Sequence, residues 1–391
     1  NHLMTFFDAD FSQDFSKNKR LKPFGIPTSW YSDPQIYELE KKLIFSKENI
    51  NYVGHELMVP ELNDYFVLAN STEILSHNKN GIELVSNICR HHQAVMLEGR
   101  GNSSQLICPV HQWCYSNDGS LLRAPNFNAH DFEHLGGKAC LSLAVKKLQS
   151  WKGLLFSGDF NLQTIFPGEG LSTADKNKRL ACLGELDFKN YAYSNTTSVP
   201  YDFNWKIFID NYLDDYHVQS FHPGLRSVVD CNEISWEFSD YYSIQGVGAQ
   251  KRRIKGSLVY QNWYDALIKN LNYSPSQFGA IWFLLYPNIM IEHYPEMLTI
   301  SVVTPVGSEK CVNTVSFFYP EEILKKHPEI VRLSQLAYQE TAIEDQEICD
   351  RIFKGKKALA ENKINDIGPC HSPSEDGMPY FHQYLLKKLS D

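Results

Sequence analysis

The sequence has no apolar run as long as the roughly eighteen residues that a membrane-spanning helix requires. Hydrophobic residues nevertheless make up 43% of its 391 residues, which is typical of a globular protein with a buried core. The chain also lacks a basic excess, because 46 Asp and Glu outnumber 37 Lys and Arg and give a net charge of −9. We therefore expect neither a membrane span nor a surface for nucleic acid or anionic lipid.

A secretory signal and an Arg-rich transit segment are also absent from the opening residues, where three residues precede Met4. The nine cysteines are an odd number and are scattered from position 89 to position 370. This pattern differs from the disulfide framework of a small secreted protein. We expect reduced thiols in a cytoplasmic protein, with a subset of them available to bind a metal.

Local patterns indicate a helix near the start, followed by a β-rich segment. Residues 29–46 have the apolar spacing of a helix, with Ser32 or Asp33 as its N-cap and Pro34 in its first turn. Short apolar runs separated by Gly, Asn and Asp turns then predict a small antiparallel β domain from about 50 to 160.

After a connector of low periodicity at 161–185, the remainder mixes helical and strand-like patterns. Aromatic and apolar residues recur at helical spacing from Trp205 to Tyr216. The strand-like runs are 282–294, 298–305 and 311–319. A long helix is predicted from Pro328 to beyond Asp350. Together these patterns indicate an α+β fold with a β insert.

Two pairs of cysteine and histidine lie in the β-rich segment. Cys89 and His91 come from "CRHHQAVML", and sixteen residues further on "CPVHQW" supplies Cys108 and His111. Zinc modules more often place two Cys in one loop and two His in the other. One Cys and one His in each loop suit a cluster with two chemically different irons, one held by thiolates and one by imidazoles. A mononuclear zinc site and a chance set of buried Cys and His are the alternatives.

The stretch "DNYLDDYHVQSFHP", residues 210–223, concentrates three carboxylates and two histidines. On a regular helix a five-residue step turns about 500°, so His217 and His222 would lie about 140° apart and could not share a metal. A π-bulge would bring them together. Alternatively the helix ends between them, which Pro223 favours by keeping the residue before it out of the helical region. Asp214 lies one turn before His217, within reach of its ring.

The predicted C-terminal helix offers a third ligand. Asp345 falls on the apolar stripe of that helix, and a carboxylate on a buried face is costly unless it is paired or bound to a metal. We expect its neighbour Glu344 to point to solvent. Two His and one carboxylate with open positions form the facial triad of mononuclear non-haem Fe(II) oxygenases. The alternative for the histidine-containing stretch is an acidic helix face with core histidines.

Together the two patterns resemble the catalytic α subunit of Rieske non-haem iron oxygenases over nearly the whole chain. The segments "SWYSDPQIYELE", "NWKIFIDNYLDDYHV", "YPNIMIE" and "EDQEICDRI" are similar, in order and spacing, to those of the choline monooxygenase-like group. The resemblance implies a [2Fe–2S] Rieske cluster held by Cys89, His91, Cys108 and His111. It also implies a mononuclear Fe(II) held by His217, His222 and Asp345.

The sequence departs from the family pattern at several positions. The family usually has Arg where His92 stands, Gly where Gln112 stands and a residue other than Cys where Cys114 stands, so His92 and Cys114 are expected to be neighbours of the cluster and not ligands. Plant choline monooxygenases also carry an extra residue before the first iron-binding histidine. This leaves a choice between Asp214 and Asp215 for the conserved acid of the family, and Asp214 keeps the family spacing.

The resemblance further implies the architecture and the partners. A Rieske domain at 50–160 is expected to be inserted in a helix-grip catalytic domain formed by 1–49 and 161–391, whose antiparallel sheet and long helix surround the iron. Electrons from NAD(P)H, delivered by a separate reductase or ferredoxin, are expected to enter the cluster and leave through His111. Asp214 of a neighbouring subunit would pass them to the iron, where O2 is the co-substrate, in a head-to-tail homotrimer.

The catalytic half is rich in aromatic residues that could recognise a substrate. They include Tyr212, Tyr216, Tyr241, Tyr242, Trp282, Phe283, Tyr286 and Tyr294. An aromatic cage with a nearby acid would hold a quaternary ammonium group by cation–π attraction. With the resemblance, this favours hydroxylation or oxidative N-demethylation of choline, carnitine or a betaine. An aromatic-ring or aromatic-acid oxygenase is the alternative enzyme, and a Rieske electron carrier, which needs no Fe(II) ligands, is the alternative outside enzymes.

Overall fold

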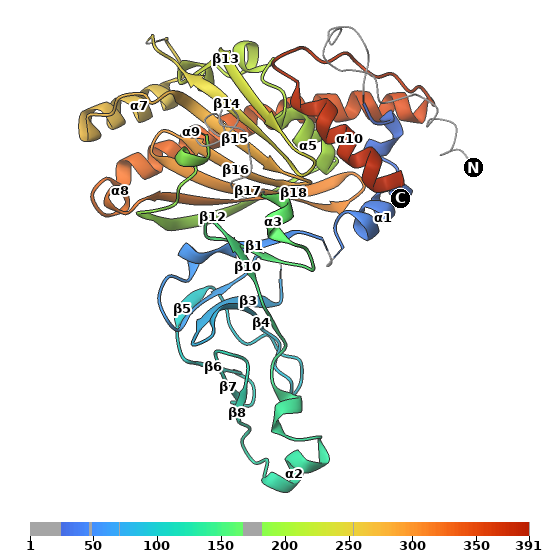
Figure 1. The fold of residues 1–391 in the computed structure, drawn as a ribbon, viewed down its shortest axis with the longest axis vertical. Coiled ribbons are helices and arrows are strands. Elements are labelled where there is room, and N and C mark those ends of the chain that lie inside the picture. Colours follow the sequence, from blue (N-terminus) through green and yellow to red (C-terminus); the bar gives the residue numbers. More distant parts are fainter. Residues whose placement is uncertain (1–24, 47–48, 70, 167–181, 253, 391) are drawn as a thin grey trace.

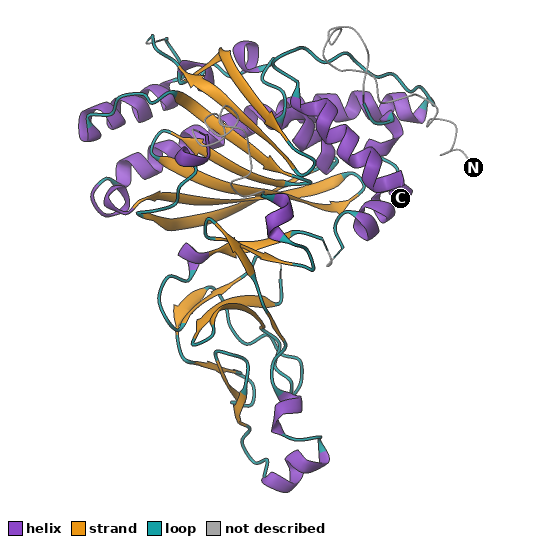
Figure 2. Ribbon diagram, in the orientation of Figure 1, coloured by secondary structure: helices purple, strands orange, loops and turns teal. Residues whose placement is uncertain are grey.

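The computed structural model describes residues 25–46, 49–69, 71–166, 182–252 and 254–390. A large sheet flanked by helices forms the upper part of the molecule, and short strands form an elongated lower lobe (Figure 1; Figure 2). The predicted α+β fold with a small antiparallel β domain is confirmed. Within these residues, no helix is both long enough and apolar enough to cross a membrane.

The helix predicted near the start is confirmed as α1 (Pro34–Leu43). The Asp33 carboxylate accepts a hydrogen bond from the backbone N–H two residues on, at 2.8 Å. Pro34 occupies the first position, where a helix has no use for its missing N–H. The N-cap is therefore Asp33 and not Ser32.

The lower lobe consists of short antiparallel strands. They are β1 (Asn51–His55), β2 (Asp64–Val67), β3 (Glu73–Asn78), β4 (Gly81–Ser86), β5 (Arg100–Asn102), β6 (Gln105–Ile107), β7 (Cys114–Ser116), β8 (Leu121–Arg123), β9 (Val145–Lys146), β10 (Gln149–Trp151) and β11 (Leu154–Ser157). They form sheets of order β1-β11-β10, β5-β2-β3-β4-β9 and β6-β7-β8. The connecting helical turns are η3 (Glu56–Met58), α2 (Ala129–His134) and η4 (Lys138–Leu141), with α2 at the lower tip (Figure 1).

The upper sheet has the order β12-β18-β17-β16-β15-β14-β13, with every neighbouring pair antiparallel. Its strands are β12 (Tyr191–Tyr201), β13 (Val229–Phe238), β14 (Tyr242–Ala249), β15 (Phe278–Leu285), β16 (Ile289–Tyr294), β17 (Met297–Gly307) and β18 (Lys310–Pro320). The strand-like run at 282–294 contains the end of β15 and all of β16. The turn between them is buried at Tyr286 and Asn288, which is why the sequence shows one continuous apolar run.

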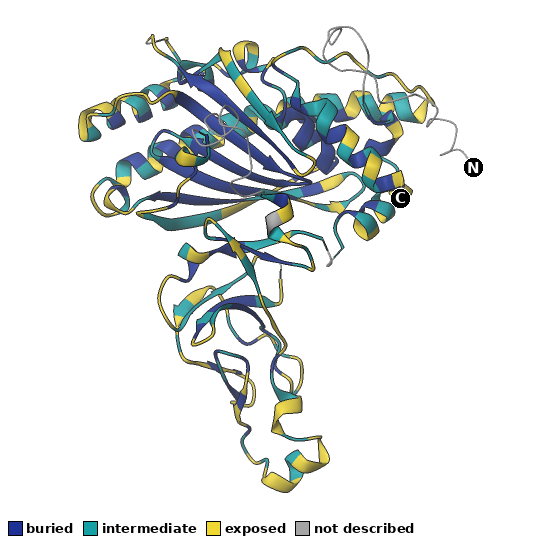
Figure 3. Ribbon diagram, viewed as in Figure 1, coloured by how far each residue is buried: buried dark blue, intermediate teal, exposed yellow. Residues whose placement is uncertain are grey.

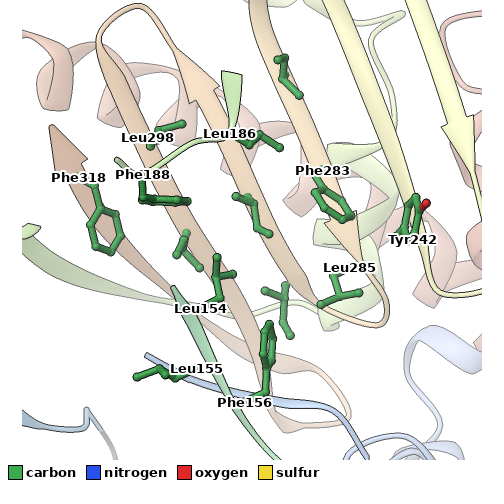
Figure 4. Packing of buried hydrophobic residues seen from close by; sticks show 14 of the residues in the cluster. Leu154, Leu155, Phe156, Leu186, Phe188, Tyr242, Phe283, Leu285, Leu298 and Phe318 are labelled. Atoms are coloured by element: carbon green, nitrogen blue, oxygen red, sulfur yellow. The ribbon is translucent and has the colours of Figure 1, made fainter. Parts of the chain in front are cut away.

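Side chains of the upper sheet alternate between its two faces, as the strand period requires. Phe283 and Leu285 of β15 face the lower lobe, where they join a cluster with Leu154 and Phe156 of β11 (Figure 4). Burying each such side chain stabilises the fold by about 1.5–3 kcal/mol. This cluster therefore fixes the lower lobe against one face of the sheet.

Helices cover the other face, so the central strands are buried on both sides (Figure 3). The helices of this part are α5 (Trp205–Tyr212), α6 (Val218–Phe221), η5 (Leu225–Ser227), α7 (Leu258–Leu271), α8 (Glu321–Lys326), α9 (Pro328–Glu361) and α10 (Gly377–Ser390). The long C-terminal helix predicted from Pro328 is α9. Trp282 of β15 packs in one cluster with Ala337 of α9 and Trp263 of α7. The space between the sheet and α9 holds the second candidate metal centre.

The helix predicted from Trp205 to Tyr216 is shorter than its pattern indicates, since α5 ends at Tyr212 and Tyr216 is 62% exposed. Most of the connector predicted at 161–185 lies outside the described residues, and α3 (Leu162–Ile165) covers its first part.

Candidate metal centres and pocket

The two Cys/His loops of the lower lobe have matching backbone geometry. In each loop the Cys N–H donates to the carbonyl five residues later, and the N–H four residues later donates back to the Cys carbonyl. These bonds join Cys89 to Ala94 and Gln93 (2.9 and 3.1 Å) and Cys108 to Trp113 and Gln112 (2.8 and 3.0 Å). Both cysteines are 1% exposed. The two thiols, which come from separate loops, contact each other inside one buried cluster.

In each loop, the residue four positions after the cysteine adopts the left-handed backbone conformation. Gln93 has φ 57° and Gln112 has φ 61°. A residue with a side chain is strained in this region, and glycine is not. The fold therefore explains why Gly is usual in the family where Gln112 stands in this chain.

The loop histidines lie at the outer edge of the two loops. The ring centroids of His91 and His111 are 4.6 Å apart, and His91 stacks on Trp113 at 4.9 Å. The Nδ1 atom of His91 is buried and has no hydrogen-bond partner among the described residues. An orphaned imidazole nitrogen beside a second imidazole fits a metal ligand better than a core histidine. Two buried thiols and two adjacent imidazoles are the donor set of a cluster with unlike irons.

Local contacts set the pKa of the Cys89 thiol and distinguish the expected cluster ligands from the neighbouring residues Cys114 and His92. Burial raises the pKa of the Cys89 thiol, and the Tyr115 hydroxyl, 3.4 Å from its Sγ, lowers it. Cys114, on β7 directly after the second loop, instead donates from Sγ to Gln105 Oε1 of β6 at 3.4 Å. His92 is exposed beside His91.

The second centre forms where α5 has ended. His217 is the N-cap residue of the single-turn helix α6, and His222 is its C-cap. This turn places the two Nε2 atoms 3.0 Å apart. The sequence left open a π-bulge or a helix that ends between the two histidines. Instead α5 ends at Tyr212, before both of them, and the single turn of α6 separates them.

Asp345 of α9 completes the group. Its Oδ1 lies 3.0 Å from Nε2 of His222 and 3.4 Å from Nε2 of His217, and it accepts a hydrogen bond from Asn211 Nδ2 at 2.7 Å. Among the described residues, His217, His222 and Asp345 have ligand atoms close enough together to bind one metal ion. Two imidazole nitrogens and one carboxylate oxygen fit a facial 2-His-1-carboxylate Fe(II) site.

The electrostatics of these groups match that donor set. Burial lowers the pKa of His217, but hydrogen bonds with Asp214 and Asp345 outweigh it and raise that pKa to about 10. Burial likewise opposes ionisation of Asp345, yet the two imidazoles hold its pKa below the usual range. A divalent cation bound here would supply the positive charge beside Asp345 in place of the imidazole protons.

Two acids precede His217, and they point in different directions. Asp214 Oδ2 lies 3.0 Å from Nδ1 of His217, on the ring edge opposite the metal group. Asp215 is 2% exposed and accepts a hydrogen bond from Gln245 instead. The geometry therefore favours Asp214 over Asp215 as the acid that orients His217.

The expectation that Glu344 points to solvent is wrong. Glu344 Oε2 lies 2.7 Å from Nδ1 of His222. Consecutive helical residues do point about 100° apart. The imidazole of His222, however, presents one nitrogen to each of them, so both Glu344 and Asp345 can reach it.

A cavity of about 100 Å³ adjoins this centre. Of the eight aromatic residues proposed from the sequence, Tyr212, Trp282 and Tyr294 line it. Tyr242, Phe283 and Tyr286 belong instead to apolar core clusters, and Tyr216 and Tyr241 are exposed. The aromatic residues missed from the sequence are Tyr201, Phe203, Phe208, Tyr260, Trp263 and Tyr338. Of these, Tyr338 could have been found from the sequence, because it lies seven residues before Asp345, about two helical turns, on the same face of α9.

The cavity is acidic. Its lining includes four carboxylates, Asp214, Asp215, Glu292 and Asp345, and no Lys or Arg within the described ranges. Glu292 was also missed, although a lone carboxylate in the apolar run "NIMIEHY" was a visible signal. A pocket of this charge favours a cationic molecule over an anionic one.

Comparisons with known proteins agree with the two-centre arrangement. The Rieske [2Fe-2S] domain family matches residues 44–149, and the family described as ring hydroxylating alpha subunit (catalytic domain) matches residues 188–391.

Individual relatives extend the similarity over almost the whole chain. Putrescine 2-hydroxylase of Ralstonia nicotianae is 42% identical over 93% of this chain and 95% of its own length. Choline monooxygenase of Amaranthus tricolor is 26% identical over 94% of this chain and 78% of its own. The crystal structure of the quaternary ammonium Rieske monooxygenase CntA has the same fold, with a TM-score of 0.72, 19% identity, and coverage of 95% of this chain and 96% of that one.

Proposed function

The chain belongs to the Rieske non-haem iron oxygenases, as a ring-hydroxylating alpha subunit, and from this premise we propose that it hydroxylates a small aliphatic amine that carries positive charge. The first choice is a primary amine such as putrescine. The second is a quaternary ammonium compound such as choline, carnitine or a betaine.

In this proposal the residues of the two centres have distinct roles. Cys89, His91, Cys108 and His111 hold the [2Fe–2S] cluster, and His217, His222 and Asp345 hold Fe(II). When bound, the two centres supply electrons and activate O2 for hydroxylation. Asp214 orients His217 through Nδ1 and offers its carboxylate to His111 of a neighbouring copy, in a homotrimer fed by a reductase or ferredoxin.

The charge of the cavity is the observation that carries the proposal. The described lining of this small space holds nine Tyr, Phe and Trp side chains, four carboxylates and no Lys or Arg. Its two histidines pair with Asp214 and Asp345, which leaves Asp215 and Glu292 without a cationic partner there. An aliphatic ammonium ion remains charged at neutral pH, as the lysine side chain does. Carboxylates and aromatic faces both attract such a cation, whereas an aromatic acid would meet like charge.

Sequence similarity supports a primary amine as the first candidate substrate and a quaternary ammonium compound as the second. The relative named putrescine 2-hydroxylase is 42% identical to this chain, and the relative named choline monooxygenase from Amaranthus tricolor is 26% identical. The quaternary candidate is kept because Tyr212, Trp282 and Tyr294 form part of an aromatic wall that suits a methylated ammonium group.

Substrate binding next to the iron can be observed directly. The protein is loaded with Fe(II), exposed to nitric oxide in place of O2, and its high-spin electron paramagnetic resonance signal is recorded with three groups of compounds. These are primary amines including putrescine, quaternary ammonium compounds, and aromatic acids. A change with primary amines is expected. A change only with aromatic acids would refute the amine proposal, and a missing high-spin signal beside an intact Rieske signal would refute the Fe(II) ligands.

A further inference from the structure

Glu292 lies in a row of side chains that crosses the upper sheet on the face toward α9. The strand register places Gln245 of β14 opposite Trp282 of β15, Trp282 opposite Glu292 of β16, and Glu292 opposite Thr299 of β17. Directly opposed side chains lie on the same face of a sheet. Trp282 and Glu292, the two middle residues of the row, line the cavity, and Glu292 is 3% exposed.

Only one of the two carboxylate oxygens of Glu292 has protein partners. Oε2 accepts hydrogen bonds from Thr299 Oγ1 at 2.5 Å and from Tyr338 Oη at 3.0 Å. Within the described chain no hydrogen bond reaches Oε1. The two hydroxyls therefore fix the orientation of the carboxylate and leave one oxygen available.

The charge of Glu292 has no counterion in the described protein. Its polar surroundings are the tyrosines Tyr212, Tyr294 and Tyr338 and the like-charged Asp345. Burial raises the pKa of Glu292 to about 7, although the hydrogen bonds from Thr299 and Tyr338 lower it. A buried carboxylate without a partner is costly, and a cation brought in by a ligand would relieve that cost.

A second hydrogen-bond acceptor lies beside Glu292. The hydroxyl oxygen of Tyr212 is buried, has no hydrogen-bond partner among the described residues, and belongs to a side chain of the cavity wall. A primary ammonium group has three N–H donors. It can therefore donate to Glu292 Oε1 and to Tyr212 Oη together, whereas a quaternary ammonium group can donate to neither.

We propose that Glu292 binds the primary ammonium group of the substrate and thereby selects primary amines over quaternary ones. The inference rests on the proposed function and deepens it. Thr299 and Tyr338 are positioning residues that aim Oε1 into the cavity. Asp215 is a poorer candidate for this role, because it already accepts a hydrogen bond from Gln245.

The test is a binding measurement on the iron-loaded protein by isothermal titration calorimetry, with putrescine, n-butylamine and choline as probes. Glu292→Gln removes the charge and keeps an oxygen for Thr299 and Tyr338. We expect the dissociation constants for putrescine and n-butylamine to rise by at least about 30-fold, as for one partner of a buried charge pair. Choline binding should change far less.

Glu296→Gln is the matched control, since Glu296 lies in the turn of the same β16–β17 hairpin but does not line the cavity. Its amine affinity should equal that of the wild type. If Glu292→Gln fails to fold or to retain iron, Glu292→Asp is used instead. This variant keeps the negative charge but moves it away from the substrate by one methylene group. The affinity for amines should then fall, and the affinity for choline should stay the same.

The outcomes separate this inference from the function on which it rests. Amine binding to a Glu292 variant with wild-type affinity overturns the role of Glu292 and leaves the amine substrate in place. Equal losses for amines and choline also overturn the role, because they indicate general damage to the pocket. If the wild type binds none of the three probes, the proposed function fails first.

Discussion

Glu344 Oε2 lies 2.7 Å from Nδ1 of His222, while Asp345 Oδ1 lies 3.0 Å from Nε2 of the same ring. Two consecutive residues of α9 thus hold both nitrogens of one histidine. A carboxylate on Nδ1 fixes the tautomer that leaves Nε2 free to bind a metal, and it strengthens that nitrogen as a ligand. At His217 the corresponding acid is Asp214, whose Oδ2 lies 3.0 Å from Nδ1.

Glu344→Gln should weaken Fe(II) binding by about 10- to 100-fold, because outer partners of metal ligands have effects of this size. Titration of the metal-free mononuclear site with Fe(II) measures it, with the absorbance of the Rieske cluster as an internal reference. Glu347→Gln, on the exposed side of α9 where Glu347 pairs with Arg351, serves as the control. Equal iron affinity in both variants would show that Glu344 is only a surface acid.

Asp214→Asn should slow reoxidation of the reduced cluster by O2 and substrate by about 10- to 100-fold when variant and wild type are compared at equal iron content. The variant keeps the shape of the side chain and removes the charge next to His217. Stopped-flow absorbance of the cluster gives the rate. Asp215→Asn should have a small effect, since the Asp215 carboxylate accepts a hydrogen bond from Gln245 and is not the acid beside His217 Nδ1. The reverse pattern would assign the bridging role to Asp215.

Removing the mononuclear iron with a chelator should abolish hydroxylation and leave the cluster spectrum intact. His217, His222 and Asp345 lie at the cavity, whereas the Cys/His loops lie in the lower lobe, so the two centres respond separately. Fe(II) added back should restore product formation. Asp345→Ala should not recover in this way. Product formation without the mononuclear iron would refute the assigned centre.

The pKa of Glu292 predicts a pH-dependent change in stability. That pKa is raised from 4.5 to about 7 in the folded protein, so the favourable neutral form is present below about pH 4.5 and is lost as the pH rises through 7. Without substrate, Glu292→Gln should therefore be more stable than the wild type at pH 8, by up to about 3 kcal/mol, and nearly equal to it at pH 4.5. Denaturant unfolding at the two pH values checks this. A variant less stable than the wild type at pH 8 would show that Glu292 has a cationic partner in the protein.

The mass of the assembly in solution tests the proposed head-to-tail homotrimer directly. Sedimentation should give about three times the 45.0 kDa chain mass. Dilution below the trimer dissociation constant should lower turnover per iron without loss of either metal, because the proposed electron route joins His111 of one copy to Asp214 of the next. Full turnover by a stable monomer would contradict the intersubunit route.

Features that depend on local spacing could be predicted from the sequence. The two Cys/His pairs, the His217 and His222 pair, and Asp345 on the apolar stripe of a long helix are of this kind. The fold class followed from the change between helical and strand-like periods along the chain.

Features that depend on tertiary packing could not be predicted. Tyr260 and Trp263 come from α7, far in sequence from the metal group, and nothing in their own segment marks them as cavity residues. Glu344 was assigned to solvent because helical spacing describes only the face of α9 and not the two-sided ring of His222. The lone carboxylate of Glu292 is visible in its apolar run, but its hydrogen bond with Thr299 depends on the cross-strand register, which a single strand pattern does not reveal.

The central claim is that this chain inserts oxygen into a small cationic amine, and isotope labelling tests it most directly. The iron-loaded protein is supplied with a reductase, NADH, putrescine and O2 made of the heavy oxygen isotope, and the product is analysed by mass spectrometry. We expect a hydroxylated amine that carries one heavy oxygen atom, and its absence in the protein treated with chelator. Reduction of O2 without any labelled amine product, together with labelled product from an aromatic acid, would contradict the account.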